Sequence, residues 1–111
     1  MKLLILDGDK YWRQHWANHG VPVAESLQEA LDIIASGSVD LVVIPASWLC
    51  YAPRLEQARV KIAVAMGKPT TKEAIRAFRT GGQAHRITAY ITKDFGLTPR
   101  KLAQIIRQGE R

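Results

Sequence analysis

The chain has few of the features that would cross-link a small protein or tether it to a membrane. Its one cysteine, Cys50, cannot form an internal disulfide or supply a cysteine-rich metal site. No apolar run approaches the ~20 residues that a membrane-spanning helix needs. The apolar start, 1–6, is too short for the core of a signal peptide. A cytoplasmic protein without a membrane partner is therefore expected.

Acidic residues are scarce in the second half of the chain. Residues 1–57 hold four Lys/Arg and seven Asp/Glu, whereas residues 58–111 hold twelve Lys/Arg and three Asp/Glu, which gives the second half a net charge of +9. Such an asymmetry favours an acidic protein partner or nucleic acid. A solvated basic surface that only aids solubility explains the same pattern.

The length and composition suit one globular domain, since the chain has 111 residues, of which 47% are hydrophobic and 23% charged. Apolar runs predict five strands, at 2–6, 21–24, 41–44, 62–66 and 87–92. Helical spacing predicts helices at 10–19, 27–36, 70–82 and from 99 onward, with at most a short helix after Pro53. This alternation predicts a single α/β domain over 1–111, a three-layer α/β/α sandwich around a five-stranded parallel sheet.

Polar residues and glycines mark where these helices begin and end. Asp9 can cap the first helix, and Gly20 can end it. Ser26 and Glu29 form a capping box for the second helix. Pro99, directly after a threonine, suits the first position of the last helix. The sequence thus carries boundary signals for the first, second and last helices.

Three segments resemble the receiver domains of two-component response regulators. They are LLILDGD at 3–9, ESLQEALDIIASGSVDLVVI at 25–44 and AYITKDF at 89–95, and the resemblance extends over nearly the whole chain. It implies the flavodoxin-like strand order 2-1-3-4-5. Sheets of this kind carry their functional residues in loops beyond the carboxyl ends of the strands.

The residues that carry phosphorylation in this family are missing. The family's third strand ends in the phosphorylated aspartate and its fourth in Ser or Thr; here Pro45 falls on the first position, and Ala65 or Met66 on the second. Because proline cannot accept a phosphoryl group, the resemblance implies a receiver fold without phosphorylation. Trp48, Cys50 and Tyr51 are expected beside this vestigial site, either as an exposed aromatic patch or as a plug of the empty pocket.

Part of the family's charged cluster remains. In the family an acidic pair after the first strand holds Mg²⁺, and a lysine ends the fifth strand. Asp7 matches the first acidic position, Gly8 falls on the second with Asp9 after it, and Lys93 matches the lysine. Two carboxylates could bind Mg²⁺ weakly. We expect instead that Asp9 caps a helix while Asp7 pairs with Lys93, and we predict no metal, cofactor or catalytic residue.

The predicted first helix carries two pairs of ring side chains at helical spacing. Trp12 and Trp16 share one face, where they either pack into the core, as we expect, or form an exposed anchor for a partner. His15 and His19 have the spacing of two metal ligands. No third ligand lies nearby in the sequence, so a zinc site is not expected.

The leading hypothesis is a receiver-like module in bacterial signalling or transcriptional regulation that is not an enzyme. It would bind a protein or dimerise through the face of the fourth helix, fifth strand and fifth helix. The basic residues expected on that face are Arg76, Arg79, Arg86, Arg100, Lys101 and Arg107. The alternative is a nucleic-acid-binding regulator that uses the same residues. We favour the first hypothesis because Phe78, Tyr90 and Phe95 are expected to be structural, which leaves no base-stacking platform.

Overall fold

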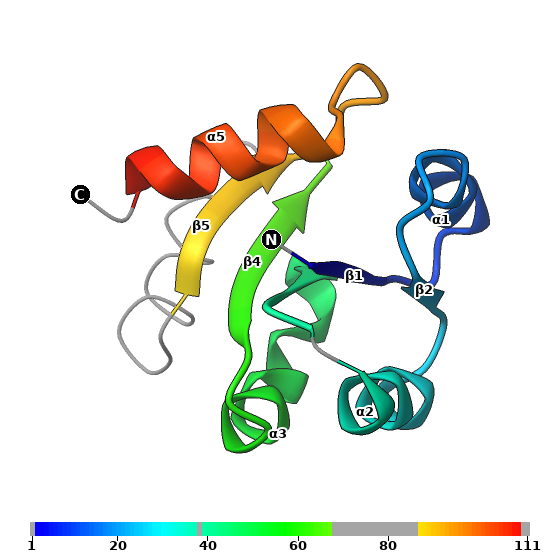
Figure 1. Ribbon diagram of the computed structural model, residues 1–111, viewed down its shortest axis with the longest axis vertical. Coiled ribbons are helices and arrows are strands. Elements are labelled where there is room, and N and C mark those ends of the chain that lie inside the picture. Colours follow the sequence, from blue (N-terminus) through cyan, green and yellow to red (C-terminus); the bar gives the residue numbers. More distant parts are fainter. Residues whose placement is uncertain (1, 38, 68–86, 110–111) are drawn as a thin grey trace.

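The computed structural model describes residues 2–37, 39–67 and 87–109, and these residues form a five-stranded parallel sheet (Figure 1). The strands are β1 (Leu3–Leu6), β2 (Val23–Ala24), β3 (Leu41–Pro45), β4 (Lys61–Met66) and β5 (Ile87–Thr92). Their order is β2-β1-β3-β4-β5, and every neighbouring pair is parallel. The predicted fold class and strand order are therefore confirmed. The predicted helix at 70–82 lies outside the described residues.

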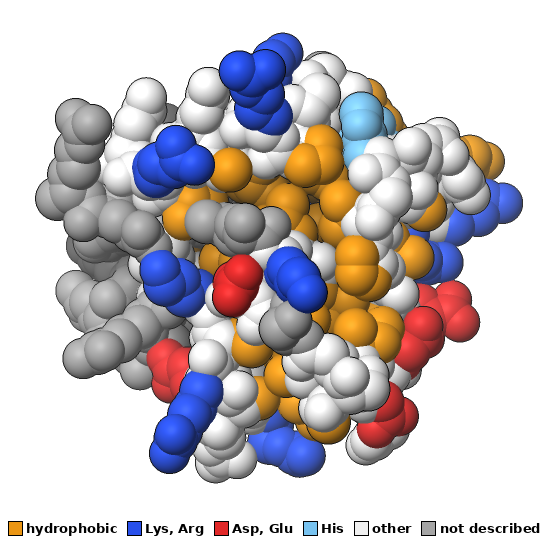
Figure 2. All heavy atoms as spheres, in the orientation of Figure 1, with side chains coloured by type: hydrophobic (Ala, Val, Ile, Leu, Met, Phe, Trp, Pro, Cys, Tyr) orange, Lys and Arg blue, Asp and Glu red, His pale blue; other side chains and the backbone are white. Residues whose placement is uncertain are grey.

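Helices cover both faces of the sheet. They are α1 (Lys10–Ala17), α2 (Leu27–Ser36), α3 (Ala52–Gln57) and α5 (Pro99–Gly109), and a 3₁₀ helix, η1 (Ala46–Tyr51), precedes α3. Helices α1 and α5 lie on one face, and α2 and α3 lie on the other (Figure 1). Hydrophobic side chains are open to view between α1, α2 and α5 (Figure 2). No helix in the described part of the chain combines the length and apolar character needed to cross a membrane.

The predicted capping residues determine where the helices begin. The Asp9 carboxylate accepts hydrogen bonds from the backbone N–H groups of the first turn of α1. The Ser26 hydroxyl accepts one from the Glu29 N–H at 3.2 Å. Helix α1 ends at Ala17, two residues earlier than predicted, and Gly20 then turns the chain with a φ of +77°.

The stretch after β3 is more ordered than its sequence suggests. At most a short helix after Pro53 was predicted, whereas the structure has six residues of 3₁₀ helix and then α3, which begins at Ala52, one residue before that proline. Trp48, in the middle of η1, has non-helical backbone angles. The segment η1 contacts both β3 and β4.

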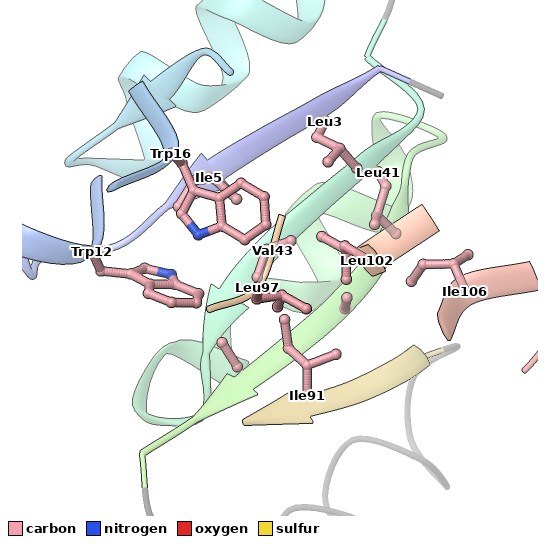
Figure 3. Packing of buried hydrophobic residues seen from close by; sticks show 12 residues of the cluster. Leu3, Ile5, Trp12, Trp16, Leu41, Val43, Ile91, Leu97, Leu102 and Ile106 are labelled. Atoms are coloured by element: carbon pink, nitrogen blue, oxygen red, sulfur yellow. The ribbon is translucent and has the colours of Figure 1, made fainter. Parts of the chain in front are cut away.

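The core has two layers, one on each face of the sheet. Leu3 and Ile5 of β1 face α1 and α5, whereas Leu4 and Leu6 face α2 and α3. Trp12 and Trp16 are fully buried in the first layer, where their rings meet edge to face (Figure 3). The core prediction for these tryptophans is confirmed, and the alternative of an exposed anchor is wrong.

Candidate functional site

An ion pair joins the loops that follow β1 and β5. Lys93 Nζ lies 2.7 Å from Asp7 Oδ2 and 4.0 Å from Asp9 Oδ2. The Asp7 side chain is only 5% exposed and that of Lys93 20% exposed. The ammonium also lies 5.8 Å from the centre of the Trp12 ring, within range of a cation–π contact. The predicted pairing of Asp7 with Lys93 is present.

Further hydrogen bonds hold the loop after β1 in place. Asp7 Oδ1 accepts a bond of 2.9 Å from the Asp9 N–H. The Asp7 carbonyl accepts one of 2.7 Å from Arg13 Nη1, and Arg13 Nη2 lies 3.3 Å from a Glu25 carboxylate oxygen. A cation that used Asp7 Oδ2 would therefore have to displace Lys93 from an already bonded loop. In the described residues no three His, Cys, Asp or Glu side chains are arranged to hold a metal ion.

The strand ends between these loops carry no nucleophile. Pro45 is buried at the end of β3 and pairs in register with Ala65 of β4. Met66, the last residue of β4, is partly buried and pairs with Thr92. Neither Ala65 nor Met66 has a hydroxyl to bind a phosphoryl oxygen, as the sequence indicates.

Trp48 lies against Gly8, the residue that the sequence resemblance aligns with a second acidic position. A Cβ atom added to Gly8 would lie 3.4 Å from Cζ2 and 3.6 Å from Cη2 of the Trp48 indole. These distances are ordinary contacts, so a methyl group fits, but a longer side chain pointing the same way would meet the ring. Trp48 is partly buried, and its ring lies 5.5 Å from that of Tyr51. Trp48 and Tyr51 are thus packed together beside Gly8 and are both partly buried.

The loop between β5 and α5 rests on α1 through Phe95. The Phe95 ring meets Trp12 and His15 edge to face, with ring centres 5.8 Å and 5.4 Å apart. His15 Nε2 lies 2.7 Å from the Leu97 carbonyl oxygen, so this ring nitrogen forms a hydrogen bond to the loop. Phe95 is nevertheless 57% exposed, and Tyr11 of α1 is 69% exposed. Phe95 therefore packs against α1, as a structural residue would, and also leaves more than half of its surface exposed.

Only part of the predicted basic face can be described. Arg100, Lys101 and Arg107 are exposed on α5. Arg76, Arg79 and Arg86 lie outside the described residues.

Tyr90 of β5 is partly buried, and burial raises the pKa of its phenol.

Three comparisons place this geometry among known proteins. No protein-family profile and no curated sequence matches the chain. Among solved structures it is similar to the receiver domain of a modulated diguanylate cyclase from Desulfovibrio desulfuricans G20, with 13% identity, a TM-score of 0.60 and coverage of 98% of this chain and 95% of that one. It is also similar to the beryllofluoride-activated NtrC4 receiver domain dimer, with 14% identity, a TM-score of 0.60 and coverage of 97% and 94%.

A third similar structure is the receiver domain of the Francisella response regulator 1452, with 20% identity, a TM-score of 0.58 and coverage of 97% and 94%. All three likenesses extend over nearly the full length of both chains. The chain therefore has the receiver-domain fold of response regulators. At these identities the likeness concerns the fold and not the chemistry.

Proposed function

We propose that this chain is a pseudo-receiver: a phosphorylation-independent, receiver-like module that contacts a protein partner or a second copy of itself in bacterial signalling or transcriptional regulation. The observation that carries the proposal is the proline at the end of β3. Transfer of a phosphoryl group to a receiver needs a carboxylate nucleophile and a metal that neutralises the phosphate. Pro45 supplies no nucleophile. Asp40 cannot replace it, because it precedes β3 at the other edge of the sheet, where it accepts a bond of 2.7 Å from the Lys2 N–H.

The surrounding contacts support a fixed rather than a switching site. Lys93 is paired with Asp7, and the Trp48 ring lies beside Gly8, so the lysine that would meet an incoming phosphate already has a partner within the chain. An interaction module needs a stable surface, and the Asp7–Lys93 pair helps to fix the loops that flank α5 and α1. The exposed Arg100, Lys101 and Arg107 offer that surface on α5. That a structurally similar receiver domain is described as a dimer supports self-association as one form of the contact.

The first experiment tests phosphorylation. The purified protein is incubated with acetyl phosphate and Mg²⁺ beside a phosphorylatable receiver domain, and intact masses are measured. We expect no adduct, and we expect Pro45→Asp alone to gain little, because the hydroxyl at Ala65 or Met66 is still absent. A hydroxylamine-sensitive phosphate adduct on the unaltered protein would contradict the proposal.

The second experiment tests the interaction surface. Light scattering and sedimentation are compared for the unaltered protein, Arg100→Glu/Lys101→Glu and a control of equal charge change, Lys10→Glu/Arg54→Glu, whose residues are exposed on α1 and α3. If the protein self-associates, only the α5 variant should weaken association. If it is monomeric, the same variants are compared in pull-downs with proteins encoded by neighbouring genes.

Nucleic acid is tested with the same variants. Labelled DNA and RNA are titrated at two salt concentrations, because a phosphate-contacting protein loses affinity steeply as salt rises. We expect weak binding at about 150 mM salt. Sub-micromolar binding that is lost in Arg100→Glu/Lys101→Glu would favour the nucleic-acid alternative, for which the exposed Phe95 could stack on a base.

A further inference from the structure

The loop between β5 and α5 holds an exposed aromatic ring in a fixed position. The Phe95 ring packs against Trp12 and His15, yet more than half of the side chain is exposed. The Asp94 carboxylate accepts a hydrogen bond of 2.8 Å from the Gly96 N–H, across the residue that carries the ring. Figure 1 shows the loop beyond the carboxyl end of β5, directly before α5. An apolar side chain that is already held in place loses little conformational entropy when a partner covers it.

The exposed ring continues along α5 as a stripe of basic and apolar side chains. Lys101 Nζ lies 3.4 Å from the Gly96 carbonyl oxygen, so the ammonium group lies beside the residue that follows Phe95. Lys101 and Ile105 are four residues apart in the helix and therefore share one face, and Ile105 is 38% exposed. We call Phe95, Lys101 and Ile105 the loop–helix stripe. It places a lysine between two exposed apolar side chains.

The charge beside this stripe is positive along the helix. Helix α5 carries no acidic residue and three basic ones, Arg100, Lys101 and Arg107. None of the three forms an ion pair in the described part of the chain. The loop itself contributes one exposed carboxylate, that of Asp94, next to Phe95. Acidic groups of a partner would therefore be attracted to α5 and repelled from the loop, which sets the direction in which the partner lies.

We propose that the loop–helix stripe binds an acidic segment of a second protein that carries two apolar residues. One apolar side chain covers the Phe95 ring, the second contacts Ile105, and a carboxylate between them pairs with Lys101. This inference rests on the proposed partner contact and specifies the chemistry of the partner. A nucleic acid fits less well, because the stripe offers one exposed ring where successive bases need several, and phosphates next to Phe95 would meet the Asp94 carboxylate.

The test uses four probes and amide NMR of the unaltered protein. The acidic probe is a capped seven-residue peptide in which pairs of glutamate separate leucine, phenylalanine and leucine. A second peptide has lysine in place of glutamate, a third has serine in place of the apolar residues, and the fourth probe is a twelve-nucleotide oligothymidylate. We expect saturable shifts with the first peptide, largest at Phe95, Gly96, Lys101 and Ile105. Its affinity should exceed that of each other probe by about fivefold or more.

Two substitutions separate the apolar and the charged part of the contact. Phe95→Ala should weaken the acidic peptide by about fivefold or more, because it removes the ring that the peptide covers. Lys101→Glu should weaken it to a similar degree and should strengthen the basic peptide, since the charge is reversed. Arg54→Glu makes the same charge change at an exposed position of α3, on the other face of the sheet, and should change binding by less than about twofold. Circular dichroism of every variant separates lost binding from lost folding.

The possible results divide clearly between support and contradiction. Equal affinity for the acidic and basic peptides, shifts centred away from the loop–helix stripe, or no saturable shift with the acidic peptide would each overturn the inference. Tighter binding of the oligothymidylate at the same residues would overturn it in favour of the nucleic-acid alternative. A phosphate adduct on the unaltered protein would instead contradict the proposed function and leave the peptide result unchanged, so the two failures are distinguishable.

Discussion

Replacement of Lys93 by methionine should destabilise the protein, because it would leave a buried carboxylate without its cation. Lys93 Nζ lies 2.7 Å from Asp7 Oδ2, and both side chains are largely buried. Breaking a fully buried pair from one side costs about 3–5 kcal/mol. In the variant, Asp7 Oδ1 would keep its hydrogen bond from the Asp9 N–H. Because the Lys93 side chain is 20% exposed, water can also approach the carboxylate from that side. We therefore expect a smaller loss in the free energy of unfolding, about 1–3 kcal/mol. In a chain of 111 residues this corresponds to a fall in Tm of roughly 4–15 °C.

Urea and thermal denaturation followed by circular dichroism measure this effect. Lys101→Met is the matched control, since it removes an exposed lysine from α5 and should change the free energy of unfolding by less than about 0.5 kcal/mol. Asp7→Asn combined with Lys93→Met should recover part of the loss, because no buried charge then remains. Equal urea midpoints for Lys93→Met and Lys101→Met would refute the structural role of the pair.

Three further changes test other contacts of the site. Gly8→Ala should leave stability nearly unchanged, whereas Gly8→Asp should lower the free energy of unfolding by about 1–3 kcal/mol, and the added change Trp48→Ala should restore part of it. Unfolding of the single and double variants measures this, and an equal loss with and without Trp48 would contradict it. His15→Ala should cost about 1–2 kcal/mol and speed amide exchange in the β5–α5 loop, since it removes the bond to Leu97 and a ring contact. Because the pKa of Tyr90 is raised in the folded state, stability should be fully present below about pH 10 and fall above it. Tyr90→Phe should flatten that fall in urea midpoints measured across the alkaline range.

The sequence predicts the strands well because their residues leave few choices. β1 and β3 are continuous apolar runs, and only the centre of a sheet covered on both faces buries such runs completely. The caps of α1 and α2 were also predicted, since Asp9 and Ser26 act on amides two or three residues away. Such short-range interactions can be inferred from spacing alone.

Contacts between distant loops could not be inferred in this way. The approach of Trp48 to Gly8 depends on the 3₁₀ helix η1, which has neither a capping residue nor an amphipathic period. The exposure of Phe95 depends on how far Trp12 and His15 cover its ring.

The Asp7–Lys93 pair spans strand ends that carry no charged side chain. β1 and β5 are separated by β3 and β4, so their axes are about 14 Å apart at the usual strand spacing. The lysine reaches Asp7 because it lies beyond the end of β5, in the loop that Phe95 holds against α1. The ends of β3 and β4 lie between Lys93 and Asp7. They carry Pro45 and Ala65, which have no charged group with which Lys93 could pair. An aspartate at position 45, on a strand nearer to β5, would offer Lys93 a closer carboxylate. Pro45 offers Lys93 no such carboxylate, and Lys93 pairs with Asp7, which joins the loops after β1 and β5.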